Sequence, residues 1–531
     1  MTLMPMEGWK MNRGTRLFVT AAACCAALLL GACGGGGSDP ATSAGPSGEP
    51  VAGGEGRVLT LSDPRTLDPA ILGNAYASGA FLGNALYGTL MTNDEADEVH
   101  YSMAESFTTT DNGKTFTLKL RPGLVFSDGT PLNTEAVKFN WDRTKDPAVG
   151  SAHRSEAATI ESSEVVDDVT LKVTLVTPVP RYALSVLASS MNWIASPAAL
   201  QKGQQAFDAK PIGAGPFTLE SWTRQADIRL VKNPRYWDAP KPYLDRLTLR
   251  AALEGNQRYN TLLTGGADVA IDSSWINLDK ATKAGLPKNV MRLSGGVFAA
   301  LNMRRAPFDD IRARRALAAA LDSDALNLAA YNGTAQLADT LFTDASPFYS
   351  ETPLRKTDKA TAQRLFDELA AEGKPLTFTF TSSTASENKA LAENIQAQLS
   401  AFRNVKVQIK TIELAEFVQL RRTLDFDAVI TSALFQDPEP RLSTVFAGGS
   451  PANLAGINDP ALNAALQTGR TATSEEERKA AYDTVQERLT ELTPMFFIAR
   501  GGLGAISGKN VGGLVQYGLG SLLPEELWIQ P

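Results

Sequence analysis

Cysteine and histidine are nearly absent from this chain. Its 531 residues include three cysteines, Cys24, Cys25 and Cys33, and two histidines, His100 and His153. Everything after position 33 therefore lacks the thiols that a disulfide or a thiolate metal site requires. A Ser-His catalytic pair or a multi-histidine metal site would depend on the two imidazoles alone. We expect no catalytic residues, no metal site and no cofactor.

Common enzyme motifs and basic patches are lacking as well. The chain has no G-x-S-x-G, no H-E-x-x-H and no P-loop. It has 51 Lys and Arg against 58 Asp and Glu, a net charge of −7, and no basic patch stands out. Nucleic-acid binding needs such residues to neutralise phosphates, so we expect no nucleic-acid partner. A secreted hydrolase, the enzyme alternative, lacks a recognisable nucleophile–base pair.

The first 32 residues have the pattern of a secretory signal. A basic lead with Lys10, Arg13 and Arg16 precedes an apolar run over 17–30 and two small residues. That run is shorter than the roughly 20 residues that a membrane-spanning helix needs. A positive lead, a short apolar core and small residues at the cut are typical of a cleaved signal, which we place at 1–32.

The residues at the predicted cleavage position indicate a second feature, a modified cysteine. Leu30-Gly31-Ala32-Cys33 resembles the lipobox of bacterial lipoproteins, in which the cysteine sulfur receives a diacylglycerol and becomes the mature N-terminus. The resemblance implies lipidation at Cys33 and an exported protein anchored to the membrane, facing the periplasm or the cell exterior. The alternatives are an uncut anchor and an ordinary signal cut near Ala32. Residues 33–56, rich in Gly, Ser, Pro, Ala and Thr, predict a flexible tether with a reach of roughly 25 Å.

Beyond the tether, strands and helices alternate. Hydrophobic periodicity predicts a strand over 57–61, a weak helix over 76–90, a hairpin within 101–125, a helix capped by Thr134 and a strand over 164–175.

The last third has the pattern of an α/β unit. A strand over 376–380, a helix over 387–402 and a strand over 405–409 predict a βαβ unit with parallel strands. Asp310 is expected to start one helix, and Gly373 to end a second one. Ser474 with Glu477 predicts a capping box at the start of a third helix, which Pro494 stops.

A series of motifs in a fixed order resembles a known family. The leading run is Met103-Ala104-Glu105-Ser106-Phe107 with 113–117 and 120–132, and the others are 67–69, 166–170, 211–217, 233–237 and 304–312. These segments resemble the signature of the family 5 solute-binding proteins, the dipeptide, oligopeptide and nickel type of bacterial ABC importer. The resemblance covers the chain from about residue 57 onward.

The resemblance implies an α/β, two-lobed, three-domain periplasmic-binding-protein fold of type II, class C-like, with a ligand cleft between hinged lobes. The implied division is lobe one over 57–88, 206–297 and 508–531, an inserted domain over 89–205, and lobe two over 298–507. The chain would cross between the lobes near Gly295-Gly296 and Gly501-Gly502, and glycines suit positions that absorb backbone rotation.

One segment bears on ligand specificity. Peptide-binding relatives carry a pattern like Asp-Tyr-x-Glu-Pro, whose aspartate binds the ligand amine. The matching segment here is Phe435-Gln436-Asp437-Pro438-Glu439-Pro440. Aligned on Glu439-Pro440, the family aspartate falls on Gln436, and a shift by one residue would give the role to Asp437. This departure puts peptide binding in doubt.

We predict a cleft lined from both lobes. The candidate ligand-binding residues are Asn74, Tyr76 and Trp275 of lobe one and Phe435, Gln436 and Asp437 of lobe two. Trp275 and Phe435 would supply flat apolar walls, and Gln436 and Asp437 directed hydrogen bonds. The alternative is that Trp275 and Phe435 pack within the lobes.

The implied partners are a small-molecule or peptide ligand, an ABC permease and ATPase complex, and the membrane through the lipid anchor. We expect a monomer. The same fold used as a sensor or adhesin without transport remains an alternative. Peptides, sugars, opines and metal chelates all stay open as ligands. Nickel held directly by the protein is disfavoured because His100 and His153 both fall in the inserted domain.

Overall fold

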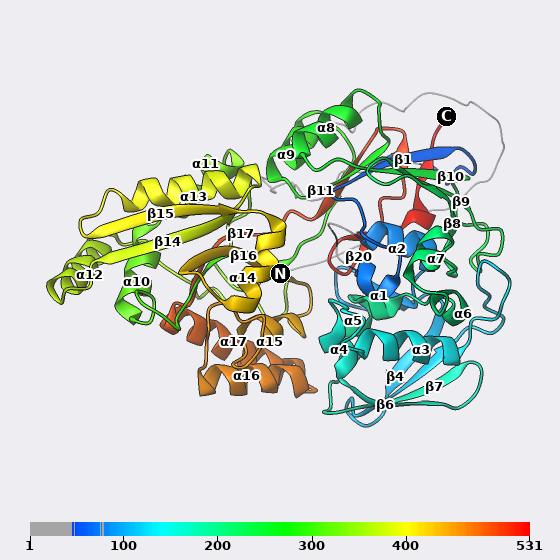
Figure 1. Cartoon of the computed structure of the whole chain (residues 1–531), viewed down its shortest axis with the longest axis horizontal. Helices are drawn as coiled ribbons and strands as arrows, with labels where there is room; N and C mark the ends of the chain where they lie inside the picture. The colour runs from blue at the N-terminus through cyan, green and yellow to red at the C-terminus, as the bar shows by residue number, and fades with distance from the viewer. Residues whose placement is uncertain (1–44, 47, 75, 77–78) are drawn as a thin grey trace, which may run out of the picture. The chain divides into compact units, whose positions relative to one another are not determined.

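The computed structural model describes residues 45–46, 48–74, 76 and 79–531, apart from the side chains of residues 414 and 415 (Figure 1). The predicted signal, Cys33 and the tether up to residue 44 lie outside the described residues. Among the helices of the described part, none is both long and apolar enough to span a bilayer.

A seven-stranded sheet forms the framework of lobe one, with the order β12-β18-β11-β1-β10-β9-β8. β1 begins at Glu55, two residues before the predicted strand, and runs parallel to both β10 and β11. The strands are β1 (Glu55–Thr60), β8 (Phe217–Trp222), β9 (Asp227–Lys232), β10 (Arg246–Ala251), β11 (Val269–Asp272), β12 (Lys288–Val290) and β18 (Gly504–Ser507). The helices α8 (Gly255–Leu263) and α9 (Trp275–Lys283) share a hydrophobic core with this sheet.

The insert contains a four-stranded antiparallel sheet in the order β4-β5-β7-β6. The predicted hairpin is confirmed, because β4 (Ala104–Thr109) pairs antiparallel with β5 (Thr115–Leu120). The single strand predicted over 164–175 is wrong. It is two strands, β6 (Ile160–Val165) and β7 (Thr170–Leu175), because Asp167 turns the chain by accepting a hydrogen bond from the Val169 amide at 2.9 Å.

The predicted cap of α3 (Thr134–Lys145) is also wrong by one residue. Asn133 is the N-cap and accepts from the Ala136 amide, while the Thr134 hydroxyl bonds the carbonyl of Asp167. The remaining helices up to residue 209 are α1 (Pro69–Leu72), α2 (Ala80–Tyr87), α4 (Arg154–Ala158), α5 (Tyr182–Leu187), η1 (Ser190–Asn192), α6 (Pro197–Leu200) and α7 (Gln204–Ala209). The helix predicted over 76–90 is thus the shorter α2, which ends before Gly88 (φ +65°).

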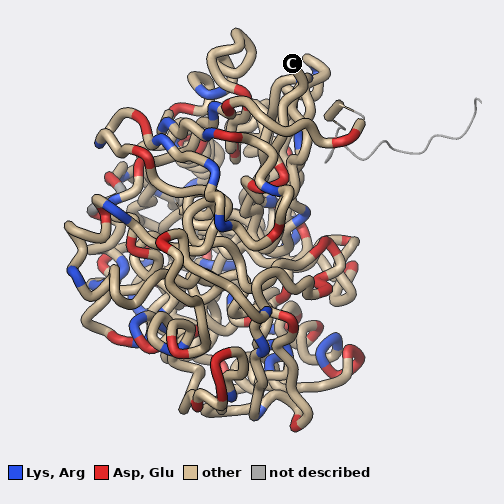
Figure 2. Tube along the Cα trace, turned by 90° about the vertical axis from the view of Figure 1, so that its right-hand side faces the viewer, with Lys and Arg blue, Asp and Glu red and all other residues tan. Residues whose placement is uncertain are grey.

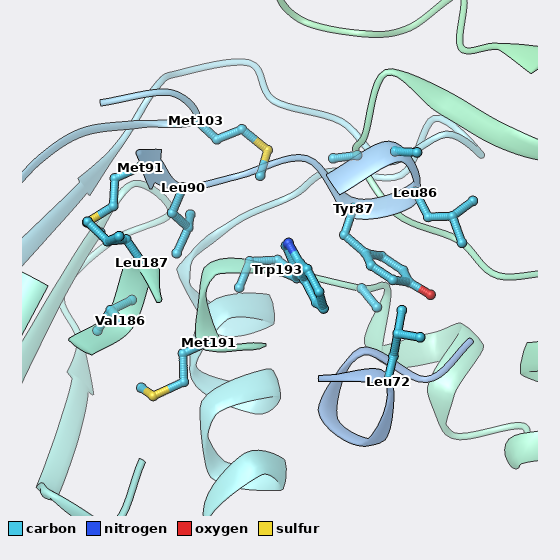
Figure 3. Packing of buried hydrophobic residues seen from close by; sticks show 14 of the residues in the cluster. Leu72, Leu86, Tyr87, Leu90, Met91, Met103, Val186, Leu187, Met191 and Trp193 are labelled. Carbon is cyan, nitrogen blue, oxygen red and sulfur yellow. The ribbon is translucent and has the colours of Figure 1, made fainter. Parts of the chain in front are cut away.

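One continuous core joins the insert to lobe one. It includes Leu230 and Leu249 of the seven-stranded sheet and Phe116 of the insert. In Figure 3 the Trp193 ring lies between Tyr87 of α2 and Leu90, and its Nε1 donates to Asn84 at 2.9 Å. A Cβ on Gly83 would lie 2.3 Å from this ring, so the close packing of α2 on Trp193 requires glycine there. Lobe one and the insert therefore form one packed body.

Lobe two is built on a five-stranded sheet in the order β15-β14-β16-β13-β17. The predicted βαβ unit is confirmed, because β14 and β15 pair in parallel, with Leu376 opposite Val405, and α13 connects them along the chain. The strands are β13 (Ser294–Leu301), β14 (Leu376–Ser383), β15 (Val405–Ile412), β16 (Ala428–Phe435) and β17 (Met495–Ala499). Lobe two has hydrophobic clusters separate from the core shared by lobe one and the insert.

Helices surround the five-stranded sheet (Figure 1). They are α10 (Ile311–Ala320), α11 (Ser323–Tyr331), α12 (Lys359–Ala371), α13 (Ser386–Leu399), α14 (Leu414–Thr423), α15 (Arg441–Phe446), α16 (Pro460–Thr471) and α17 (Glu475–Leu492). Asp310 caps α10, as predicted. Of the capping box predicted for α17, the structure has the bond from the Glu477 amide to Ser474. α17 ends two residues before Pro494, and Gly373 follows α12 with φ +77°.

Two connections join the two large sheets. The first covers residues 291–293, between β12 and β13, and the second covers 500–503, between β17 and β18. Gly501 and Gly502 lie in the second connection, where the sequence placed a crossing. β18 belongs to the sheet of lobe one, so this crossing lies a few residues before the predicted boundary at 507. The three-domain division as a whole stays a prediction.

The other predicted crossing is displaced. Gly295 and Gly296 lie inside β13, where they pair with Leu434 and Ala433 of β16. They are strand residues of lobe two and not a free hinge.

The short elements that complete the fold are β2 (Met91–Asn93) with β3 (Val99–Tyr101), β19 (Val511–Gly512) with β22 (Trp528–Ile529), β20 (Gln516–Tyr517) with β21 (Ser521–Leu522), and η2 (Pro524–Glu526). Charged residues of both signs are interspersed along the trace (Figure 2), in line with the modest net charge of −7.

Candidate functional site

A cavity of about 370 Å³ lies where the insert, the first connection and lobe two meet. Its lining comes from 95–97 and 180–181 of the insert, from 291, 292 and 294, and from 343, 345–348, 436–437, 472, 473, 475 and 478 of lobe two. We call it the interlobe cavity. Its size suits a solute of a few residues or a small sugar derivative, and clefts between domains are common ligand sites.

A buried ion-pair network forms one wall of the cavity. Asp437, two residues after β16, accepts two hydrogen bonds from the Arg478 guanidinium, at 2.9 and 2.8 Å. Arg181 of the insert adds a third contact, 3.0 Å from its Nε to Asp437 Oδ2. The Asp437 and Arg478 side chains are only 5% and 7% exposed. Asp437 therefore already has two arginine partners before any ligand enters.

Gln436 links the lobes directly. Its Nε2 donates to the backbone oxygen of Asp94 at 2.8 Å, and its Oε1 accepts from Asn93 Nδ2 at 2.9 Å. Asn93 and Asp94 belong to the β2–β3 hairpin of the insert. Together with the Arg181–Asp437 pair, these bonds hold lobe two against the insert at the edge of the cavity.

Asp97 faces the same cavity from the insert. Its Oδ1 accepts from Asn93 Nδ2 at 2.9 Å. Burial and the neighbouring Asp437 carboxylate raise the pKa of Asp97 to about 7, against the opposing effect of Arg181. A carboxyl group so placed is poised to change its charge near neutral pH.

Of the six residues predicted to bind ligand, the structure brings Gln436 and Asp437 to the interlobe cavity. Asn74 is buried in lobe one, donating to the Leu187 carbonyl at 3.2 Å and accepting from Ser521 at 2.9 Å. The buried Tyr76 hydroxyl accepts from the Gly504 amide at 2.9 Å.

The two predicted aromatic walls also lie away from the cavity lining. Trp275 begins α9 and donates from Nε1 to the Arg500 carbonyl at 2.9 Å, beside the second connection. Phe435 is 1% exposed and packs edge-on against Phe342, with ring centroids 5.7 Å apart. Packing within a lobe therefore describes Phe435, whereas Trp275 packs against a hydrophobic cluster of each lobe. Contact of any of the six residues with a ligand stays a prediction.

Sequence reasoning missed the insert's contribution to the cavity. The signal that could have found it is the acidic run Asp94-Glu95-Ala96-Asp97-Glu98, which lies between two short strands. No local pattern marks Arg478, since it lies within an ordinary amphipathic helix.

The two histidines have structural partners. His100 Nε2 lies 3.0 Å from Asp94 Oδ2 on the surface, and His153 Nδ1 accepts from the Ser190 amide at 3.2 Å. Burial lowers the pKa of His153. Over the residues that the structure describes, no group of three or more His, Cys, Asp or Glu side chains is arranged to hold a metal ion.

The sequence of the chain is similar to those of known proteins. The model of the bacterial extracellular solute-binding proteins, family 5, matches residues 98–453. The glutathione-binding protein GsiB of Escherichia coli K12 is 29% identical over 367 residues, which span 68% of this chain and 70% of that protein.

Solved structures resemble this chain over about nine tenths of its length. AgaA of A. tumefaciens R10, in complex with agropinic acid, is 25% identical with a TM-score of 0.78, covering 90% of this chain and 99% of that one. DppA of Helicobacter pylori, in complex with the peptide STSA, is 21% identical with a TM-score of 0.79, covering 91% and 99%. The predicted α/β periplasmic-binding-protein fold is thereby confirmed.

Proposed function

Because the chain belongs to the family 5 bacterial extracellular solute-binding proteins, we propose that it captures a peptide or similar small solute in the interlobe cavity and delivers it to an ABC permease. As a member of this family it is a binding protein and not an enzyme. The observation that carries the proposal is the cavity itself, which is lined by the insert and by lobe two and bordered by hydrogen bonds between them. The ligands named for the relatives are glutathione, agropinic acid and the peptide STSA.

The experiment that tests this proposal is mass spectrometry of the small molecules released from the purified, folded protein. We expect one solute of peptide or amino-acid-derivative size. Added back to the stripped protein, that solute should raise the melting temperature in a saturable way. If the protein releases no solute, and neither peptides, glutathione nor opines shift its melting temperature, capture of such solutes is refuted.

The closing movement would carry lobe two against a body made of lobe one and the insert. The single core shared by lobe one and the insert supports this division, as do the separate clusters of lobe two. The connections at 291–293 and 500–503 are the segments in which rotation would occur. We propose these segments as the hinge.

Gln436→Ala is expected to weaken binding without removing a charge. It deletes the two hydrogen bonds to Asn93 and Asp94, each worth about 1 kcal/mol net. A closed state disfavoured by about 2 kcal/mol lowers the apparent affinity roughly 30-fold. Calorimetry with the co-purified solute measures the change.

The matched control for this variant is Gln408→Ala, an exposed glutamine on β15 of the same lobe. It should leave both affinity and melting temperature unchanged. Equal affinities for Gln436→Ala and the wild type would remove Gln436 from the closing contact.

We also propose that Cys33 is lipidated and that the lipid anchors the protein to the membrane. Cys33→Ser removes the only acyl acceptor at the lipobox, so the full-length protein should move almost entirely from the membrane pellet to the soluble fraction. Fractionation of cells expressing either form measures this change. Cys25→Ser is the control and should stay in the pellet. A Cys33→Ser protein that remains there would identify an uncut hydrophobic anchor instead.

A further inference from the structure

The ion pairs of the interlobe cavity are unevenly distributed among its carboxylates: Asp437 has two, and Asp97 has none among the residues that the structure describes. Four acidic residues, Glu95, Asp97, Asp437 and Glu475, and three arginines, Arg181, Arg292 and Arg478, contribute to its lining. Arg181 and Arg478 both bond the carboxylate of Asp437. Over the described ranges no ion pair reaches the Asp97 carboxylate, and Arg181 contacts only its backbone oxygen, at 3.4 Å.

Asp97 is nevertheless held in a defined position. It has φ +61° in the turn between β2 and β3, and Asn93 Nδ2 bonds its Oδ1. The same Asn93 amide nitrogen donates to Gln436, so the group that orients Asp97 also spans the lobes. Within the described part of the chain, no hydrogen bond is formed to Asp97 Oδ2. Asp97 thus lines the cavity with one carboxylate oxygen held by Asn93 and no guanidinium of the described residues in ion-pair contact, while Arg181 and Arg478 act on it only at longer range.

We propose that Asp97 of the insert, and not Asp437, receives the cationic group of the captured solute, which is therefore a small molecule carrying an ammonium or guanidinium group. This assignment rests on the proposed solute-binding function and specifies its substrate class. A cation at Asp97 supplies the partner that Arg181 and Arg478 do not, and charge-assisted hydrogen bonds of this kind are about twice as strong as neutral ones. Solute entry would also relieve the repulsion between Asp97 and Asp437.

The assignment makes binding pH-dependent in a defined direction. Because burial and Asp437 raise the pKa of Asp97 to about 7, the group is largely neutral at pH 5.5 and largely ionised at pH 7.5. An α-ammonium group has a pKa of about 7.7–8.0 and is still more than half protonated at pH 7.5, so the affinity should rise roughly 10- to 20-fold from pH 5.5 to 7.5. The other charged groups of the cavity around Asp97 are Arg181, Arg292, Arg478, Asp437, Glu95 and Glu475. The buried Glu439, two residues after Asp437, has its pKa raised by burial to about 8.

The test uses the dipeptide Met-Leu and its N-acetyl derivative, which lacks the cation, in calorimetric titrations of the wild type, Asp97→Asn and Glu98→Gln. Asparagine keeps an oxygen that can accept from Asn93, and Glu98 is an exposed neighbour in the same loop. We expect the wild type and Glu98→Gln to bind Met-Leu at least tenfold more tightly than the N-acetyl form at pH 7.5. In Asp97→Asn the preference should fall below about threefold and the pH dependence should flatten.

Three outcomes overturn the assignment: Asp97→Asn keeps the full preference, the wild type shows none, or the wild type binds only solutes without a cationic group. The last two outcomes would not refute the proposed capture of a solute. A wild type that binds no solute of any class would refute the proposed function, and the Asp97 assignment would fall with it. Melting temperatures of both variants within about 2 °C of the wild type establish that each is folded.

Discussion

Replacing Arg478 with methionine is expected to destabilise lobe two by about 3 kcal/mol, because it leaves the buried Asp437 carboxylate short of its main partner. Arg478 also donates from Nε to the Gly469 carbonyl at 3.1 Å, and its guanidinium lies 4.7 Å from the Phe348 ring centroid. Methionine fills similar volume but makes none of the polar contacts. Arg181 still reaches Asp437 at 3.0 Å, which places the expected loss at the lower end for a broken buried pair.

Calorimetric unfolding detects this change best, because lobe two over 298–507 contains no tryptophan. The matched control is Arg488→Met in the same helix, whose ion pair with Asp459 is partly exposed and should be worth under about 1 kcal/mol. The double variant Asp437→Leu with Arg478→Met should recover part of the loss, since no buried charge is then left unpaired. Equal losses for Arg478→Met and Arg488→Met would contradict a buried structural role.

Gly295→Ala is expected to cost at least about 2 kcal/mol of lobe-two stability. Gly295 has φ +75° within β13, and a Cβ there would lie 1.9 Å from the backbone oxygen of Ala433. The left-handed conformation alone costs an alanine about 1–2 kcal/mol, and the clash forces β13 away from β16. Thermal unfolding of the purified variant measures the change.

Gly373→Ala separates the cost of the left-handed backbone conformation from the cost of the clash. Gly373 has a similar φ of +77°, but no atom lies within 4 Å of the position of its Cβ. Its substitution should cost only the backbone preference, about 1–2 kcal/mol. A Gly295→Ala protein no less stable than Gly373→Ala would show that the strand tolerates the extra carbon, and the sheet pairing at Gly295 would need revision.

The parts of the fold predicted correctly are those set by nearby residues. The hairpin around Asp111-Asn112-Gly113, the Ser474 cap and the βαβ unit at 376–409 each depend on a short stretch of sequence. The errors arise where a local sequence pattern is compatible with two different secondary structures. The alternation over 164–175 continues across a tight turn, so one strand and two strands have the same periodicity.

The site was only partly predictable because its residues meet through long-range topology. Asp437 and Arg478 are 41 positions apart, and Gln436 reaches Asp94 across 342. The family pattern pointed to the segment at 435–440, which does reach the cavity, but not to the role of each side chain. In the sequence, Asp437 takes the amine-binding role only if the family pattern shifts by one residue, and its two arginine partners lead us to propose Asp97 for that role instead. Tyr76 and Phe435 look like ligand contacts in sequence, yet both are buried within the lobes.

The most direct test of solute capture between the lobes is a distance measurement across the cavity. The chain after residue 33 has no cysteine, so cysteines placed at the exposed Glu164 of β6 and Gln467 of α16 can carry spin labels without side reactions. In the solute-free protein we expect a broad distribution of label distances. Saturation with the co-purified solute should collapse it to a single, shorter distance, and Gln436→Ala should need more solute to reach that state. A distribution unchanged at saturation would contradict closure of lobe two on the insert.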